Sequence, residues 1–391
     1  MKKHLKKWGV ILIIPTIIIS LLLYIDSIQN RNLLEEEERT EKIEEYEDDA
    51  EEEIIFSYPE KQNEQEKETI EIEEHEIAEA AWIPPWDYTR GVNSVDERFY
   101  TISPVTFSIN DNGTLTPRLD ANLSILKNEI GEQDIKIIPT ISNFDWKQMQ
   151  RIFENPQKTQ QHINSIVNAV NQYDYDGIDL DYESISSENK QEFLEFVKNL
   201  SSELSKSNKL LSITVLPKWG EDINYTTLSG TRKTQDWEYI GRYADKVRIM
   251  TYDFTSPGGS TAGPIAPIGW VEEVLEYAIK KVPKEKIWLG IHLYSYEWVM
   301  PKKDIDSKPV KTNSYTYDTI TTQILKRENI HIKYSDDFEE GYADYPCQDT
   351  YHCLLYYATP QSVEARKDLA KNYEIAGVVY WRLGGEGNIL D

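Results

Sequence analysis

Eight apolar, β-prone segments alternate with helical stretches, and this rhythm constrains the fold more than any other feature of the chain. Alternating strands and helices are typical of a (β/α)8 barrel, whose parallel strands are apolar because both of their faces are buried. The predicted strands are 79–86, 99–109, 135–142, 176–183, 210–216, 246–254, 286–294 and 376–383. The predicted helices between them include 159–172, 189–207 and 270–281. We therefore predict an α/β chain built on a TIM barrel.

An open, doubly wound sheet is the structural alternative. It would normally carry a glycine-rich phosphate turn after its first strand. The chain has Trp82-Ile83-Pro84-Pro85-Trp86 at that point, which favours the barrel. The interval after the seventh strand is longer than a βα unit requires, and it holds short β-like pieces at 330–334 and 354–357. This interval predicts a small inserted α+β lobe at about 299–357.

Residues 176–183 read Asp-Gly-Ile-Asp-Leu-Asp-Tyr-Glu. Asp179, Asp181 and Glu183 are spaced two apart, which places three carboxyl groups on one face of the predicted fourth strand. Three like charges at this spacing cannot all ionise cheaply, so at least one pKa must rise. A charged strand edge that discourages aggregation is the alternative. The cluster favours catalysis, because a general acid needs a raised pKa.

Two further strand ends carry residues of catalytic type. Met250-Thr251-Tyr252-Asp253-Phe254 ends the predicted sixth strand, where Met250 and Tyr252 share parity and are expected to point inward. Trp381 ends the eighth strand. A core role is the alternative for each residue taken alone. In a barrel, however, the carboxyl ends of all strands meet at the face that holds the catalytic groups.

The octapeptide resembles the signature Asp-x-x-Asp-x-Asp-x-Glu of glycoside hydrolase family 18, the chitinase-like hydrolases. The segment 250–253 is similar to the family's Met-x-Tyr-Asp motif, and the resemblance extends from about residue 77 to residue 391. The segments 82–86 and 296–298 look most like the bacterial branch that includes spore-cortex and cell-wall hydrolases.

The resemblance implies a role for each motif residue. Glu183 would protonate the glycosidic oxygen and later activate water, while the substrate's own 2-acetamido oxygen acts as the nucleophile with net retention. Asp181 would orient the acetamide, and Asp179 would share a proton or charge with Asp181. The remaining implied roles are an acetamide contact for Tyr252, sugar binding for Asp253 and Met250, and a hydrophobic floor for Trp381. No cofactor is implied.

Trp82 and Trp86, on the predicted first strand, are expected to line the glycan groove through their flat rings. Gly177 is expected to allow close strand packing, and Asp176 to act as a structural hydrogen-bonding residue.

The N-terminal segment predicts export. Four lysines within residues 2–7 precede an apolar run at 8–25, which is long enough to span a bilayer with its basic end in the cytoplasm. We expect residues 1–30 to form a single-pass signal-anchor. Secretion after signal cleavage is the alternative, but the residues after the run lack the small side chains that a cleavage site needs.

An acidic stalk is predicted at 31–76. Residues 35–79 hold 22 Asp and Glu against 4 Lys and Arg, so this segment cannot bury a core and is expected to be disordered. The catalytic domain is predicted at 77–391, outside the membrane and facing the cell wall. The net charge of −26 argues against nucleic acid as a partner, and we expect a monomer.

Cys347 and Cys353 are expected to pair across a hairpin, since an exported protein permits disulfides. A zinc site with His352 is the alternative, but two Cys and one His do not complete a tetrahedral set, so no metal is expected.

Three functions remain open at this point. They are hydrolysis of β-1,4 bonds of N-acetylglucosamine in peptidoglycan, the same chemistry on chitin or another glycan, and lectin-like binding without catalysis. The presence of Glu183 argues against the third, and the predicted anchor favours the first.

Overall fold

The computed structural model describes residues 77–118, 134–221, 230–302, 308–348 and 350–391. The predicted membrane span and acidic stalk lie outside these residues. Among the helices that the structure does describe, none is long and apolar enough to cross a bilayer.

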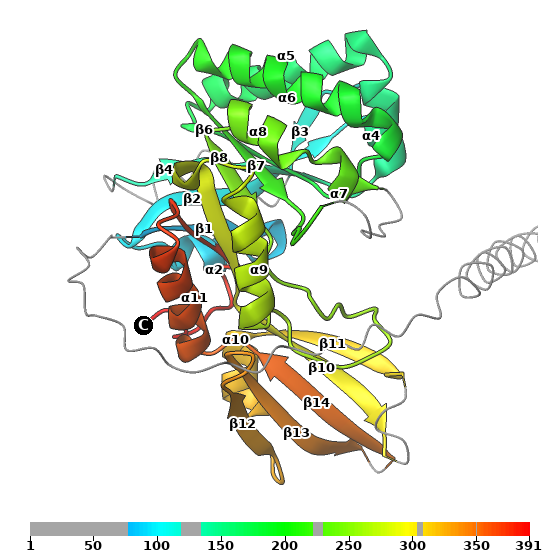
Figure 1. Cartoon of the computed structure of the whole chain (residues 1–391), viewed down its shortest axis with the longest axis vertical. Coiled ribbons are helices and arrows are strands. Elements are labelled where there is room, and N and C mark those ends of the chain that lie inside the picture. Colours follow the sequence, from blue (N-terminus) through cyan, green and yellow to red (C-terminus); the bar gives the residue numbers. More distant parts are fainter. Residues whose placement is uncertain (1–76, 119–133, 222–229, 303–307, 349) are drawn as a thin grey trace, which may run out of the picture. The chain divides into compact units, whose positions relative to one another are not determined.

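A closed parallel barrel forms the centre of the fold (Figure 1), as the strand rhythm predicted. Strand β1 pairs with both β2 and β15, and this double pairing closes the barrel. Its strands are β1 (Ala78–Ile83), β2 (Phe99–Ile109), β4 (Lys136–Ile137) with β5 (Thr140–Asn143), β6 (Gly177–Tyr182), β7 (Leu210–Val215), β8 (Lys246–Ile249), β9 (Ile287–His292) and β15 (Gly377–Trp381). A short strand, β3 (Leu115–Pro117), runs antiparallel to β2.

Three predicted strands differ from the observed ones by more than two residues at their ends or by a break. β1 stops at Ile83 because prolines follow it, so Trp86 lies in a 3-10 turn and not on the strand. The third strand is interrupted at Pro139, which has no N–H to donate, and it splits into β4 and β5. β8 stops at Ile249 because the chain turns there, with Thr251 N donating to Ile249 O.

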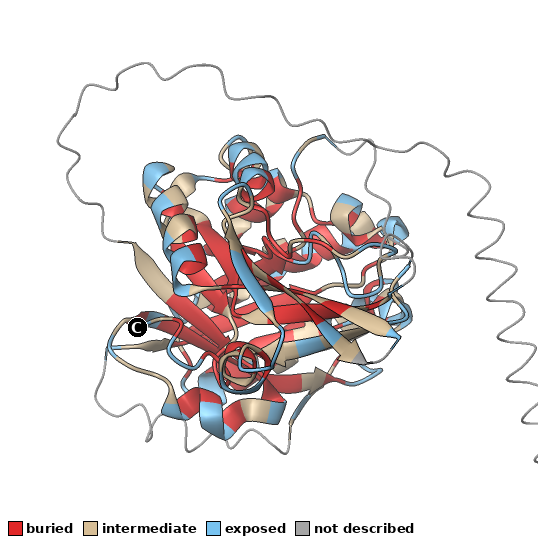
Figure 2. Ribbon diagram, turned by 90° about the horizontal axis from the view of Figure 1, so that it is seen from below, coloured by how far each residue is buried: buried red, intermediate tan, exposed pale blue. Residues whose placement is uncertain are grey.

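Helices cover the outside of the barrel and present exposed residues on their outer faces (Figure 2). The three predicted helices exist with shifted ends. Helix α5 begins at Pro156 and not at residue 159, because Asn155 caps it by accepting from the backbone N–H groups of residues 157 and 158. The helices are α2 (Tyr88–Asn93), α4 (Trp146–Phe153), α5 (Pro156–Gln172), α6 (Lys190–Ser205), α7 (Thr231–Thr234), α8 (Trp237–Tyr243), α9 (Ile268–Ala278), α10 (Tyr317–Thr319) and α11 (Pro360–Asn372). Shorter turns are η1 (Pro85–Asp87), η2 (Ser187–Asn189), η3 (Lys284–Lys286) and η4 (Ile320–Ile324).

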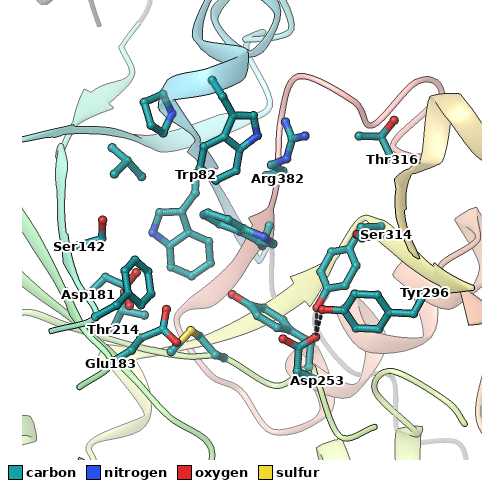
Figure 3. A pocket seen from close by; sticks show the side chains of 18 of the residues that line it. Trp82, Ser142, Asp181, Glu183, Thr214, Asp253, Tyr296, Ser314, Thr316 and Arg382 are labelled. Carbon is teal, nitrogen blue, oxygen red and sulfur yellow. Dashed lines mark hydrogen bonds between the residues drawn. The ribbon is translucent and has the colours of Figure 1, made fainter. Parts of the chain in front are cut away.

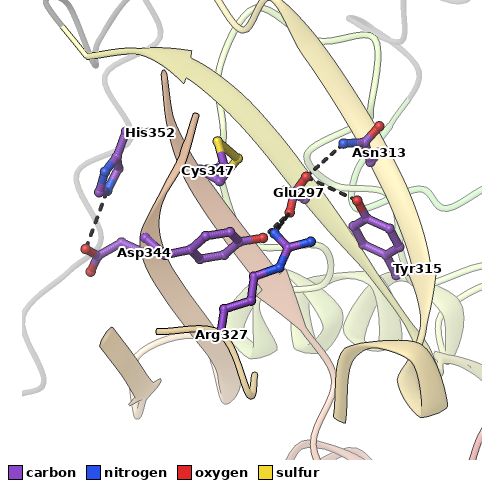
Figure 4. Close-up of a disulfide and its surroundings, with 9 residues drawn as sticks. Glu297, Asn313, Tyr315, Arg327, Asp344, Cys347 and His352 are labelled. Carbon is purple, nitrogen blue, oxygen red and sulfur yellow. Dashed lines mark hydrogen bonds and ion pairs between the residues drawn. A yellow bond between two sulfur atoms is a disulfide. The ribbon is translucent and has the colours of Figure 1, made fainter. Parts of the chain in front are cut away.

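The predicted insertion is a five-stranded antiparallel sheet in the order β11-β10-β14-β13-β12, with α10 and η4. It begins at Tyr294, directly after β9 and earlier than the expected residue 299. Its strands are β10 (Tyr294–Pro301), β11 (Lys311–Thr316), β12 (His331–Ser335), β13 (Glu340–Gln348) and β14 (Tyr351–Tyr357). A disulfide joins Cys347 to Cys353 across β13 and β14 (Figure 4).

Two buried carboxylates fix the insertion. Glu340 accepts from the backbone N–H groups of Ile265 and Ala266 at 2.9 and 2.6 Å, and Arg366 of α11 lies 3.3 Å away. Glu340 therefore ties β13 to the loop after β8. Burial raises the pKa of this carboxyl to about 7.

The second carboxylate, Glu297 on β10, accepts from Asn313 Nδ2 at 2.8 Å and from the Tyr315 hydroxyl at 3.2 Å (Figure 4). These bonds order β11 along one side of the cleft described below.

Strands β6 and β7 approach so closely at Gly177 that a side chain does not fit. A Cβ on Gly177 would lie 2.2 Å from Leu210 O, a backbone atom that cannot move away alone. We expect Gly177→Ala to lower the free energy of unfolding by about 1–3 kcal/mol, measured by urea unfolding. Gly269→Ala in α9 is the matched control, since no atom lies within 4 Å of its Cβ, and it should cost nothing. Equal stability of the two variants would contradict the packing argument.

Candidate active site

A cleft of about 410 Å³ opens at the carboxyl end of the barrel strands. Eight of the nine predicted catalytic and substrate-binding residues line it (Figure 3). The ninth, Asp179, does not, because it is fully buried deeper in the barrel. The eight are Trp82, Trp86, Asp181, Glu183, Met250, Tyr252, Asp253 and Trp381. Residues far apart in the sequence thus meet in one cavity because the strands are parallel and in register.

Three carboxyl groups follow one another up the inner face of β6. Asp179 is fully buried, Asp181 is 9% exposed and Glu183 lies at the cleft. β6 ends at Tyr182, so Glu183 is the first residue after the strand and not its last. The ladder nevertheless continues through it, since Glu183 N donates to Asn143 O of β5 at 3.0 Å.

Asp179, the deepest carboxyl, is surrounded by hydrogen-bond donors. Hydroxyl groups contact both of its oxygens, and the indole N–H of Trp82 and the guanidinium of Arg248 contact Oδ2. The donor distances are 2.6 Å from Ser212, 2.9 Å from Thr140, 3.1 and 3.2 Å from Thr214, 3.1 Å from Trp82 and 3.5 Å from Arg248. This shell stabilises a negative charge inside the barrel.

Asp181 and Glu183 have far fewer partners. Among the described residues Asp181 Oδ1 is buried without a hydrogen bond. Burial, and then the charges of Glu183 and Asp179, raise the pKa of Asp181 well above its ordinary value. Burial, and then the charge of Asp253, raise the pKa of Glu183 to about 7. A carboxyl with that pKa can give or take a proton near neutral pH.

Tyr252 lies close to the carboxyl groups. It follows β8, is 8% exposed and lines the cleft beside Met250. Burial, and then the charges of Asp181, Glu183 and Asp253, raise the pKa of its phenol well above 10. Its hydroxyl therefore keeps its proton and can donate a hydrogen bond to a substrate oxygen.

Asp253 is held by two tyrosines that the motifs did not predict. Its Oδ1 accepts from the hydroxyl of Tyr294 and, at 2.9 Å, from that of Tyr296 (Figure 3). Asp253 itself has a left-handed backbone with φ of 60°. Both tyrosines lie at the start of the insertion, so the insertion shapes the site. Their alternation on β10 is the signal that could have indicated them.

The aromatic residues of the cleft form its floor and its rim. Trp82 is 2% exposed and packs edge to face against Trp381, with 6.0 Å between the ring centroids. Its indole N–H donates a hydrogen bond to Asp179. Trp82 therefore lines the cleft as a buried part of its floor. Trp86 is 65% exposed, and the Arg382 guanidinium lies 5.6 Å from its ring centre.

Two arginines also line the cleft, and sequence reasoning missed both. Arg382 pairs with Asp87 at 2.6 Å. Arg118 makes one long hydrogen bond, 3.5 Å to Ser142 Oγ, and its buried Nε has no partner among the described residues. No group of three or more His, Cys, Asp and Glu side chains in the described ranges is arranged to hold a metal ion.

The sequence family of this chain follows from a direct comparison. The model of glycosyl hydrolases family 18 matches residues 47–386. The chain belongs to glycosyl hydrolases family 18. The resemblance predicted from the motifs on β6 and after β8 is thereby confirmed. Membership places the chain among glycosidases.

Two curated relatives of this family member come from Bacillus species. The cortical fragment-lytic enzyme of Bacillus anthracis is 29% identical over 57% of this chain and 49% of its own length. The enzyme of that name from Bacillus subtilis is 24% identical over 71% and 63%. The chain thus spans about half to two thirds of these relatives.

Solved structures share the fold. The spore cortex-lytic enzyme SleL of Bacillus cereus aligns with a TM-score of 0.70 and 22% identity, over 80% of this chain and 73% of that one. A chitinase from Chromobacterium violaceum aligns with a TM-score of 0.72 and 20% identity, over 80% and 96%. At this identity the likeness shows the fold alone.

The raised pKa of Glu183 predicts a pH-dependent effect on stability. The folded state keeps the Glu183 proton up to about pH 7, whereas an unfolded glutamate releases it near its ordinary value of 4.5. The folded state therefore binds more protons between these values, and stability from this group falls as pH rises through them. Glu183→Gln removes the effect, so its melting temperature should exceed that of wild type increasingly from pH 5 to pH 8. Exposed Glu188 supplies the control Glu188→Gln, and a constant difference at Glu183 would refute the assignment.

Proposed function

We propose that this chain hydrolyses β-1,4 bonds of N-acetylglucosamine in peptidoglycan by substrate-assisted, retaining catalysis. The observation that carries the proposal is the Glu183 carboxyl, with a pKa of about 7, in one cleft with Asp181 and Tyr252. The other cleft carboxyl, Asp253, has one oxygen occupied by two tyrosine hydroxyls. The substrate's acetamido oxygen then supplies the nucleophile that a second free carboxylate would otherwise provide.

The reaction proceeds in two steps. Glu183 donates its proton to the glycosidic oxygen as the acetamido oxygen bonds to the anomeric carbon and the glycosidic bond breaks. Asp181, whose Oδ1 has no protein partner, accepts from the acetamide N–H, and the Tyr252 hydroxyl donates to the acetamido oxygen. Glu183, now a carboxylate, takes a proton from water, which opens the oxazolinium ring with retention of configuration.

Two observations support peptidoglycan over chitin. The relatives from Bacillus anthracis and Bacillus subtilis are named cortical fragment-lytic enzymes. In addition, Arg118 brings into the cleft a guanidinium without a carboxylate partner among the described residues. Peptidoglycan carries carboxylates on its sugar substituents whereas chitin is neutral, and guanidinium groups bind carboxylates well.

The location of the enzyme is also a proposal. An anchor at 8–25 with a stalk at 31–76 would hold the catalytic domain outside the cell and facing the wall, with secretion as the alternative. Recovery of the full chain in the membrane fraction, with the domain open to added protease on intact cells, would support the anchored form. Recovery in the medium would support secretion.

Activity of the full chain on purified peptidoglycan tests the proposed function. We expect wild type to release reducing ends, Glu183→Gln to release none above background, and the control Glu188→Gln to match wild type. Activity that survives Glu183→Gln would contradict the catalytic assignment. Cleavage of chitin alone would favour the chitinase alternative, and binding without cleavage the lectin-like one.

A change at Arg118 tests the substrate class. Loss of a charged hydrogen bond to substrate should lower kcat/KM of Arg118→Gln on soluble peptidoglycan fragments by about tenfold. Chitooligosaccharides lack the carboxylate, so their kcat/KM should stay within about twofold of wild type. Arg118→Lys, which keeps the charge, should retain part of the discrimination. An equal loss on both substrates would contradict recognition of an anionic substituent.

A further inference from the structure

Arg248 is a wholly buried cation in the middle of the barrel, and the mechanism above does not use it. It lies on β8 two residues before Met250, so its side chain points inward with the same parity. Its Nη1 lies 3.5 Å from Asp179 Oδ2 and donates to Ser103 Oγ at 2.6 Å. Its guanidinium carbon lies 5.5 Å from the centre of the Trp82 ring.

The groups around Asp179 favour its ionised form. Four of the five side chains that contact it are neutral donors, from β1, β5 and β7, and the fifth is Arg248. An indole N–H and a guanidinium can donate but cannot accept, so neither could receive a proton carried by Asp179. A buried carboxylate with a paired cation and a full set of donors is the arrangement in which ionisation is least costly.

Asp181 has the opposite surroundings. Among the described residues it forms no ion pair, its Oδ1 lacks a hydrogen bond, and the Arg118 guanidinium in the same cleft contacts Ser142. It lies between Asp179 and Glu183 on the same face of the chain, so an ionised Asp181 would face the negative charge of Asp179 from below and, once Glu183 ionises, a second negative charge from above.

We propose that Arg248 is a positioning residue that keeps Asp179 as a carboxylate, so that the proton of the Asp179–Asp181 pair stays on Asp181. Arg248 touches no substrate and acts through Asp179. The proton placement concerns the folded protein itself, and only its kinetic consequence rests on the proposed function.

The kinetic consequence concerns Glu183. With a neutral Asp181 below it, Glu183 meets less negative charge and stays a usable acid near neutral pH. Without the Arg248 cation, the proton of Asp181 passes to Asp179, and Asp181 is left ionised beside Glu183. A new negative neighbour raises the pKa of Glu183, so the alkaline limb of kcat/KM moves to higher pH.

Other charged groups near this pair do not reverse the expectation. Asp253 and Tyr252 face Glu183 from the segment after β8 and are unchanged by the substitution. Lys246, the first residue of β8, lies at the far end of the barrel from the cleft, against Trp288. Burial, and then the charge of Arg248, lower the pKa of Lys246 to about 7.

Carbon-13 NMR of aspartate carboxyl groups tests the proton placement without relying on activity. The full chain is labelled at the aspartate carboxyl carbon, and Asp179→Asn and Asp181→Asn assign the two signals. We expect wild type at pH 6 to show Asp179 ionised and Asp181 protonated. In Arg248→Gln we expect Asp179 to become protonated. The reverse placement in wild type, or identical signals in Arg248→Gln, would overturn the proposal.

Kinetics of matched variants test the consequence. On soluble peptidoglycan fragments we expect Arg248→Gln to change kcat more than KM, with kcat lowered. The alkaline limb of its kcat/KM profile should shift upward by about one pH unit. Arg248→Lys, which retains the charge, should keep the wild-type limb. Arg366→Gln removes the buried arginine of α11 that pairs with Glu340, and it should lower the melting temperature without moving the limb.

A double variant guards against failure to fold. Loss of the Arg248 cation leaves Asp179 and Asp181 with one buried negative charge between them and no cation to compensate it, so Asp179→Asn with Arg248→Gln should melt higher than Arg248→Gln alone. An unshifted limb in an active Arg248→Gln would overturn the positioning role. Absence of activity in wild type would contradict the proposed function and leave the NMR result to decide the proton placement.

Discussion

The structure depends on three carboxyl groups, on β6 and directly after it, that share one inward face and are solvated less the deeper they lie in the barrel. The cost of burying each negative charge is offset in a different way, which depends on how deep the residue lies in the barrel. Asp179, fully buried, is compensated by donors and by Arg248. Asp181 and Glu183, nearer the cleft, are compensated by protons, as their raised pKa values indicate. The cost of burying these charges therefore keeps a proton on Glu183, which can donate it at the cleft.

The rest of the fold places partners around this strand. Closure of the barrel by β1 and β15 brings Trp82 beneath the cleft and Trp381 beside it. The insertion contributes the two tyrosine hydroxyls that hold Asp253, and Asp253 in turn helps to raise the pKa of Glu183. The insertion, tied to the barrel loops through Glu340, thus tunes the acid from outside the barrel.

Much of this arrangement could be predicted from local sequence, because strand parity and parallel register place alternate residues at one mouth. Asp181, Glu183, Tyr252 and Trp381 were found in this way. Arg248 was not predicted, although it shares parity with Met250 in an apolar strand, because its role depends on its contact with Asp179 on another strand.

Strand ends were less predictable. Met250 to Asp253 continue an apolar pattern that resembles a strand, yet the chain turns after Ile249. Trp86 similarly continues the pattern of β1, but the prolines before it end the strand. Tyr294 and Tyr296 were not predicted, because their alternation places both on one face of β10 but does not reveal that this face meets Asp253.

The central claim is that one protein carboxyl works with the substrate's own acetamide, and stereochemistry tests this claim most directly. Proton NMR of the first sugar product, recorded before mutarotation, reports the configuration at the newly formed reducing end. The account predicts the β-anomer, because two inversions at the anomeric carbon give retention. Initial formation of the α-anomer would show direct attack by water and contradict the account.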